Sequence, residues 1–305
     1  MVETKKLKRI FENIENYEGY VKSFVKGTFN KNQILKSLSD NHSKNTKLLP
    51  LKDIFFGVKD IINIEGYPTR CGSNLPHELF GGQQASVVNN LLNAGASFIA
   101  KTVTAEFAIS DPGETRNPRN LLHTPGGSSS GSGAAVAAEF CDFAIGTQTC
   151  GSVIRPAGYC GVVGYKPSYG LISRNGELRT SYTLDHIGMF GRTVEDVALL
   201  AKVLIKKDNY DPATIYYSAE NILNETKKGP LFEPKFIFYK TDYWKIIEKK
   251  SREAFEYFIK SFKNIEVFDT PSYFKDIHKY HQIIHETDLA NNFGIYYKKY
   301  KSKLS

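Results

Sequence analysis

The pattern of apolar and polar residues along the chain changes near residue 54. Before that point, residues 4–45 are polar, with apolar residues recurring at helical spacing, and residues 20–25 have the composition of a short strand. The apolar positions are Ile10, Phe11, Ile14 and Tyr17. We expect residues 1–45 to form a helical N-terminal lead-in to a single core domain over residues 46–305.

Beyond residue 54, short apolar runs alternate with helical patterns and are separated by Gly, Pro and Asn. The predicted strands lie at 54–58, 97–100 and 143–149, and the predicted helices at 85–94, 244–263 and 274–299. Alternation of strands and helices is typical of an α/β fold. We predict a twisted, mixed, mostly parallel sheet covered by helices on both faces.

Two serines flanked by glycines interrupt this pattern. Ser128 lies in a Gly/Ser loop that runs into an alanine-rich helical stretch over residues 124–138, and Ser152 follows the buried strand predicted at 143–149. In open α/β sheets, sites are usually built at the ends of strands. Both serines therefore lie where a site is expected.

A lysine upstream, Lys59, follows the apolar run at 54–58. A serine hydroxyl is a weak nucleophile unless a base accepts its proton, and a desolvated, neutral lysine can be that base. Glycine next to Ser152 would let several N–H groups point at one oxyanion. Those N–H groups belong to Thr149, Cys150, Gly151 and Ser152. Taken singly, the same serines would be turn or cap residues and the lysine a surface charge.

Three separated motifs resemble the amidase signature family, and they occur in the family's order. The motifs are GVKD at 57–60, PGGSSSGSGAAVAA at 125–138 and GTQTCGSVIRPAGYCGVVGYKPSYG at 146–170. The resemblance extends from about residue 57 through residue 200, and more weakly beyond. It is closest to free-standing bacterial amidases, which are related to the A subunit of glutamyl-tRNA amidotransferase.

The resemblance implies a role for each matching residue. Ser152 would be the acylated nucleophile, Ser128 the bridging serine on a cis peptide and Lys59 the general base, with Ser129 supporting the network. The implied reaction is hydrolysis of the carbon–nitrogen bond of a linear, small-molecule amide through an acyl-enzyme. It needs no cofactor and no metal, and a homodimer is compatible with the resemblance.

Three positions near Ser152 modify this expectation. Arg155 resembles a position that binds a substrate carboxylate in malonamidase-like members, although an ion pair with Asp185 is an equal alternative. Cys150 stands where most members have glycine, so its side chain is expected to narrow the pocket. Gln148 replaces an aspartate of many members, which favours a free-standing amidase over the tRNA-dependent enzyme.

The sequence is also compatible with other functions. The chain ends at Ser305, earlier than is usual in the family, so we expect a short C-terminal part, and a truncated, inactive amidase-fold protein is one alternative. Another is an A-subunit-like component acting on aminoacyl-tRNA with glutamine hydrolysis. The loop at 126–133 could cradle a phosphate, although no GxxxxGK[ST] pattern is present. His278, His281 and His285 share one face of a predicted helix and could bind a metal.

Composition and charge narrow these choices. The net charge is +8, yet residues 40–200 hold 13 basic and 14 acidic side chains, so we expect no nucleic-acid partner. The N-terminal residues lack the apolar run of a signal peptide, and no stretch approaches the roughly 18 apolar residues that span a bilayer. We expect a cytoplasmic protein without membrane contact. The four cysteines lack CxxC spacing, which disfavours a zinc site or a disulfide framework.

Overall fold

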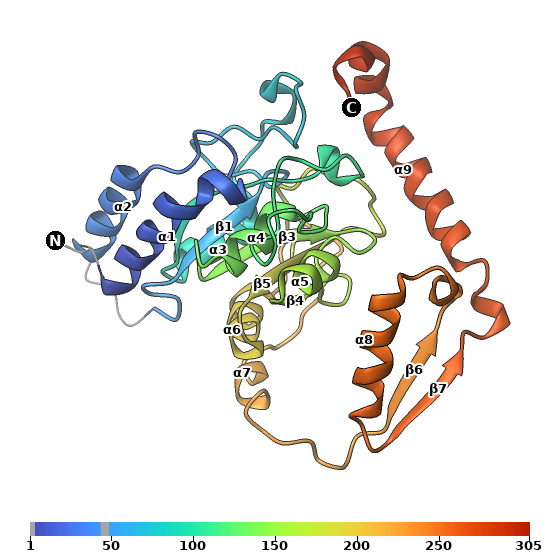
Figure 1. Cartoon of the computed structure of the whole chain (residues 1–305). Helices are drawn as coiled ribbons and strands as arrows, with labels where there is room; N and C mark the ends of the chain where they lie inside the picture. The colour runs from blue at the N-terminus through green and yellow to red at the C-terminus, as the bar shows by residue number, and fades with distance from the viewer. Residues whose placement is uncertain (1–3, 44–48) are drawn as a thin grey trace. The chain divides into compact units, whose positions relative to one another are not determined.

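A computed structural model describes residues 4–43 and 49–305 of the chain (Figure 1). The chain divides into two compact units: one comprises the residues up to 226 together with 288–305, and the other comprises residues 227–287. The sheet and the predicted site residues all belong to the first unit.

Two helices form the N-terminal segment: α1 (Lys5–Val21) and α2 (Lys31–Ser43). The α1 residues predicted from the helical pattern, Ile10, Phe11 and Ile14, are buried as expected, whereas Tyr17 is exposed. The strand predicted at 20–25 is wrong, because α1 continues to Val21 and only Phe24 forms an isolated bridge. The pairing with β2 is limited to the Val25 N–H on the Lys101 carbonyl oxygen and the Val103 N–H on the Ser23 carbonyl oxygen, while the Glu18 carboxylate accepts the Phe24 N–H at 2.6 Å. Residues 1–3, 44 and 45 of the predicted lead-in lie outside the described residues.

The central sheet has five strands in the order β2-β1-β3-β5-β4. They are β1 (Phe55–Lys59), β2 (Ser97–Thr102), β3 (Phe143–Gln148), β4 (Val163–Tyr165) and β5 (His186–Gly191). β1 pairs in parallel with β2 and β3, whereas β5 is antiparallel to both β3 and β4. Four of the five strands therefore run the same way, which confirms the predicted mixed, mostly parallel sheet.

Helices cover both faces of this sheet, as predicted. α3 (Ser86–Asn93) and α6 (Val194–Leu204) pack in one apolar cluster, and α1, α4 (Ser130–Ala137) and α5 (Ile154–Cys160) pack in the other. Neighbouring strand residues enter opposite clusters, because successive side chains of a strand point to opposite faces. Phe55 lies with α4 and Phe56 with α3, and burial of each such side chain contributes about 1.5–3 kcal/mol.

The remaining elements are shorter or belong to the second unit. α7 (Ile222–Glu225) ends the first stretch of the first unit. In the second unit, β6 (Phe236–Lys240) and β7 (Ile265–Asp269) form a parallel pair connected through α8 (Lys249–Lys260). α9 (Ile277–Tyr300) begins in this unit, and its residues from Asp288 onward belong to the first. The helices predicted near 244–263 and 274–299 are confirmed, with α8 starting five residues later than expected at Lys249.

The first turn of α4 approaches the end of β2 so closely that only glycine fits at position 131. A Cβ on Gly131 would lie 2.2 Å from the Ser23 carbonyl oxygen and 2.3 Å from the Val103 nitrogen. The Gly131 N–H also donates to the Val103 carbonyl oxygen at 2.9 Å. Because the neighbouring atoms are backbone, they cannot move aside independently, and this approach fixes the position of the Gly/Ser loop.

We predict that Gly131→Ala lowers the free energy of unfolding by about 3 kcal/mol or more, at the upper end of overpacking costs. Chemical denaturation measures this change. Gly19→Ala is the matched control, because no atom lies within 4 Å of the added Cβ in α1, and there the substitution should stabilise by about 0.5–1 kcal/mol. Equal stability of Gly131→Ala and the unsubstituted protein would contradict the close approach.

Candidate active site

The last residue of β1, Lys59, places an amine inside the protein. Its side chain is fully buried, and Nζ lies 2.8 Å from Ser128 Oγ and 2.8 Å from Thr147 Oγ1. Burial lowers the pKa of Lys59 to about 7, although the nearby Glu177, Asp185 and Cys71 oppose this shift. A substantial fraction of neutral amine is therefore present at neutral pH, and in that form Nζ can accept a proton from Ser128.

The Gly/Ser loop forms hydrogen bonds with three other segments, through Ala105, Thr147 and Ser152. The peptide bond between Gly127 and Ser128 is cis, as the family resemblance implies, and the Ser128 carbonyl oxygen accepts the Ala105 N–H at 3.0 Å. The Ser129 hydroxyl donates to the Thr147 carbonyl oxygen at 3.1 Å and accepts the Thr147 N–H at 3.3 Å. The Ser129 N–H donates to the Ser152 carbonyl oxygen at 3.3 Å, which connects the two serine loops.

Ser152 occupies the turn between β3 and α5, and the side chain of Gln148 holds this turn. Gln148 Oε1 accepts the N–H groups of Val153 at 2.9 Å and Ile154 at 3.0 Å. Ser152 is 8% exposed, and its hydroxyl forms no hydrogen bond with the residues that the structure describes. The amide oxygen of Gln148 thus supplies the acceptor that fixes the turn, while the serine hydroxyl is left available.

Asp185 anchors the start of the same turn through Thr149. The carboxylate of Asp185 accepts the Thr149 hydroxyl at 2.6 Å and the N–H groups of Thr180 and Ser181 at 2.7 and 2.8 Å. Next to Thr149, the N–H group of Cys150 donates to no acceptor within the described ranges, and the same holds for the N–H of Gly151. The Cys150 side chain is exposed, so it does not fill the turn from inside.

Arg155 is exposed and reaches back over both loops. Its Nη1 donates to the Gly127 carbonyl oxygen at 3.4 Å, and its Nη2 lies 2.9 Å from the point that a Cβ on Gly151 would occupy. The alternative of an ion pair with Asp185 is wrong, because Asp185 is buried and engaged by Thr149 and the 180–181 backbone. The guanidinium therefore keeps donors for another partner.

The structure thus brings Lys59, Ser128 and Ser129 into one hydrogen-bonded cluster and ties it to the backbone of Ser152. Sequence reasoning missed Thr147, the second partner of Lys59. A threonine in a strand has no distinctive sequence signal, since β-branched residues are common there.

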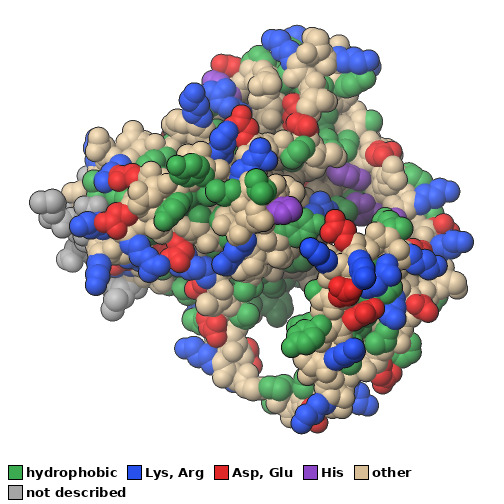
Figure 2. Space-filling view, viewed as in Figure 1, with side chains coloured by type: hydrophobic (Ala, Val, Ile, Leu, Met, Phe, Trp, Pro, Cys, Tyr) green, Lys and Arg blue, Asp and Glu red, His purple; other side chains and the backbone are tan. Residues whose placement is uncertain are grey.

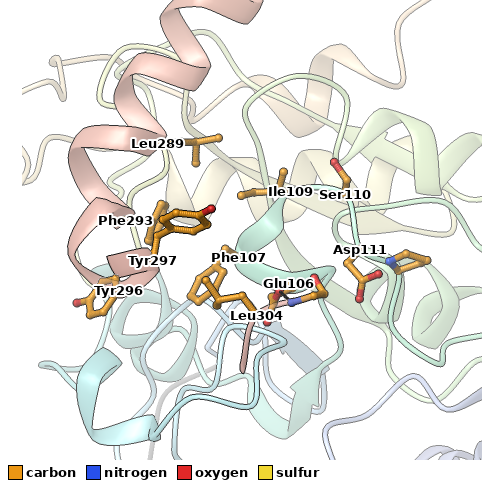
Figure 3. A pocket seen from close by; sticks show the side chains of 12 residues that line it. Glu106, Phe107, Ile109, Ser110, Asp111, Leu289, Phe293, Tyr296, Tyr297 and Leu304 are labelled. Carbon is orange, nitrogen blue, oxygen red and sulfur yellow. Dashed lines mark hydrogen bonds between the residues drawn. The ribbon is translucent and has the colours of Figure 1, made fainter. Parts of the chain in front are cut away.

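One cavity of the first unit lies away from both serine loops. It measures about 540 Å³ and lies between the loop at 106–112 and the C-terminal residues from Leu289 onward (Figure 3). Phe107 and Phe293 face one another there, with ring centroids 5.2 Å apart. Neither Ser128 nor Ser152 lines this cavity, so the cavity does not mark the position of the two serines.

Comparison with known proteins assigns the fold to a family. A family model described as Amidase matches residues 6–302. The chain belongs to the Amidase family.

The relatives of this chain include proteins named as A subunits of an amidotransferase and a protein named as an amidase. The chain is 39% identical over 238 residues to the A subunit of a glutamyl-tRNA(Gln) amidotransferase from Lachnospira eligens, covering 74% of this chain and 49% of that protein. The crystal structure of the corresponding protein from Thermotoga maritima has a TM-score of 0.73 at 29% identity, over 93% of this chain and 62% of the other. A crystal structure described as an amidase gives 0.78 at 26% identity, over 98% and 67%. The chain spans about half the length of the curated relatives it matches.

The alternative sites receive less support from the geometry. In the Gly/Ser loop, the N–H groups of Ser129 and Gly131 already donate to the Ser152 and Val103 carbonyl oxygens, so they do not form a phosphate cradle. Within residues 4–43 and 49–305, no three potential metal ligands come together, which includes the histidines of α9. No helix in these ranges has the length and apolar character to cross a membrane.

The buried amine of Lys59 predicts a pH-dependent stability. Between pH of about 7 and the ordinary value of 10.5, the unfolded chain binds a proton that the folded protein does not. The contribution of Lys59 to the free energy of unfolding therefore rises with pH across this window and is lost as pH falls to about 7. We expect the stability of Lys59→Met relative to the unsubstituted protein to decrease by roughly 1 kcal/mol per pH unit as pH rises from 7.

Denaturant titrations at a series of pH values measure this difference. Lys52→Met is the matched control, because the Lys52 side chain is exposed and its loss should leave the pH dependence unchanged. Parallel stability curves for Lys59→Met and the unsubstituted protein would rule out a neutral buried amine.

Proposed function

We propose that this chain hydrolyses the carbon–nitrogen bond of small-molecule amides through an acyl-enzyme on Ser152, with Ser128 as proton relay and Lys59 as general base. The observation that carries the proposal is the fully buried Lys59, whose pKa is lowered to about 7 and whose Nζ lies 2.8 Å from Ser128 Oγ. Membership of the Amidase family supports the same reaction.

The proposed reaction moves one proton back and forth along this relay. Neutral Lys59 accepts the Ser128 proton while Ser128 accepts the Ser152 proton, and Ser152 Oγ attacks the amide carbonyl carbon. The N–H groups of Thr149, Cys150 and Gly151 stabilise the oxyanion. As the C–N bond breaks, the leaving amine takes the proton from Lys59 through Ser128. Water then attacks the acyl-enzyme by the same relay and releases the carboxylic acid.

Arg155 is proposed to select the substrate. Its exposed guanidinium lies beside Gly127 and Gly151, one on each serine loop, and has no carboxylate partner in the described part of the chain. A guanidinium binds a carboxylate with two parallel hydrogen bonds. Amides that carry a carboxylate near the scissile bond are therefore the proposed substrate class.

An A-subunit-like role is the second candidate, in which the same chemistry hydrolyses glutamine for an aminoacyl-tRNA reaction. It is favoured by the 39% identity to the amidotransferase protein from Lachnospira eligens. Basic and acidic side chains are interspersed on the face shown in Figure 2, so the net charge of +8 does not by itself favour a tRNA partner. Activity on glutamine that depends on aminoacyl-tRNA and on a second protein chain would favour this role over independent hydrolysis.

We predict that a fluorophosphonate probe labels Ser152, and that Ser152→Ala and Lys59→Met each reduce labelling at least about 10³-fold, since removal of one member of a catalytic triad removes most of the acceleration. Mass spectrometry of peptides identifies the labelled serine, and stopped reactions give the rate. Ser168→Ala, an exposed serine outside both loops, is the control and should react normally. A folded chain that is not labelled at Ser152 would support the inactive amidase-fold alternative.

Arg155→Gln should lower kcat/KM about 10–100-fold for amides that carry a carboxylate and leave uncharged amides within about threefold, because a charged hydrogen bond contributes roughly 1.5–3 kcal/mol. Paired assays on a carboxylated amide and its neutral amide analogue measure the ratio. An equal loss on both substrates would show that Arg155 acts only by supporting the loops.

A further inference from the structure

The carboxyl group of Glu177 is buried without a partner. Both of its oxygen atoms are inaccessible to solvent, and neither has a hydrogen-bond partner among the described residues, although other atoms of the residue are partly accessible. A buried polar group without a hydrogen bond destabilises the folded state. The Glu177 carboxyl therefore does not stabilise the fold, and a different role would account for its presence.

Backbone pairing holds Glu177 beside the end of β1. Ile62 and Glu177 form an antiparallel bridge, the Leu178 N–H donates to the Ile61 carbonyl oxygen at 2.7 Å, and the Asn63 N–H donates to the Gly176 carbonyl oxygen at 2.8 Å. Residues 61–63 follow Lys59 closely in the chain. The segment that carries Glu177 is thus fixed against the segment that carries the proposed base.

Four charged groups act on the Glu177 carboxyl: Asp185, Arg174, Arg179 and Lys59. Burial raises its pKa well above the ordinary value and Asp185 adds to the rise, while the three cations oppose it. Arg174 is itself bound to Asp211, with Nε 3.1 Å from Oδ2, so its charge is already paired.

The interaction between Glu177 and Lys59 also affects the pKa of Lys59. Glu177 is the strongest of the groups that raise the Lys59 pKa, ahead of Asp185 and Cys71. Asp185 accepts hydrogen bonds from Thr149, Thr180 and Ser181, whereas Glu177 has no such bonds within the described ranges. Of the two carboxyls acting on the amine, Glu177 is therefore the one whose ionised form is not stabilised by neighbouring donors.

We propose that Glu177 is a positioning residue for the proton relay: its buried carboxyl, on the segment paired with residues 61–63, controls the protonation of Lys59. The inference rests on the proposed function of Lys59 as general base. An ionised Glu177 favours the ammonium form that arises during acylation, and a neutral Glu177 favours the free amine that starts it. Two buried groups that interact in this way titrate as a pair.

An NMR titration of protein labelled with ¹³Cε-lysine tests the proposal without requiring turnover. The Lys59 signal is assigned by its absence in Lys59→Met. In Glu177→Gln the Lys59 midpoint should fall by about half a pH unit or more, because the substitution removes the carboxyl whose ionised form favours the ammonium form. Glu177→Asp keeps a carboxyl and should remain nearer the unsubstituted midpoint. An unchanged midpoint in Glu177→Gln overturns the proposal.

Two controls separate this role from a structural one. Glu65→Gln removes the same charge from an exposed position and should leave the midpoint in place; an equal shift there would reduce the effect to overall charge and overturn the proposal. If Glu177→Gln does not fold, Glu177→Leu replaces the carboxyl with an apolar side chain and should give the same fall. A gain in thermal stability with no change in midpoint would identify Glu177 as a merely unfavourable buried group.

The pH dependence of Ser152 labelling provides the kinetic readout. The acidic limb of the labelling rate should move to lower pH in Glu177→Gln by the same amount as the NMR midpoint. Absence of labelling in the unsubstituted protein would contradict the proposed function, whereas the NMR midpoints would still decide whether Glu177 controls Lys59. A labelled Glu177→Gln with an unmoved limb would contradict the inference alone.

Discussion

The site depends on the burial of one amine at the end of β1. Removing Lys59 from water disfavours its charged form, and the neutral form still needs hydrogen-bond partners. Ser128 and Thr147 provide them from the loop before α4 and from β3, each at 2.8 Å. Three chain segments must therefore meet at one nitrogen, and the desolvation that destabilises the folded chain is also what makes this lysine suitable as a base.

Two buried cations elsewhere in the first unit are paired directly with carboxylates. Lys101 Nζ lies 3.0 Å from Asp60 Oδ1, and Arg174 binds Asp211 through two nitrogens. Direct pairing opposes the effect of burial on the charges of both partners, which is consistent with a structural role. Lys59 and Glu177 form no ion pair within residues 4–43 and 49–305, and each acts on the other only through the buried medium. This difference distinguishes the two groups of the proposed proton relay from the directly paired charges in the same core.

The serine loops are positioned by acceptors and backbone groups more than by the serines themselves. Gln148 fixes the turn after Ser152, Asp185 fixes Thr149 before it, and the close approach at Gly131 fixes the other loop. A proton relay requires its donor and acceptor to be within hydrogen-bond distance, so small displacements of either loop would interrupt it. Rigid support is thus a condition for the proposed chemistry.

The sequence by itself determined the alternation of strands and helices, the two serine loops and the lysine, because periodicity and motif order are local properties of the chain. Its pattern did not reveal that residues 20–25 form no strand, because α1 continues to Val21 and leaves only an isolated bridge at Phe24. Only the tertiary structure decided that Lys59 bonds Thr147, that Asp185 bonds Thr149 instead of Arg155, and that Glu177 is buried without a partner among the described residues. Hydrogen-bond partners distant in sequence are chosen by strand register and loop packing, which no local pattern encodes.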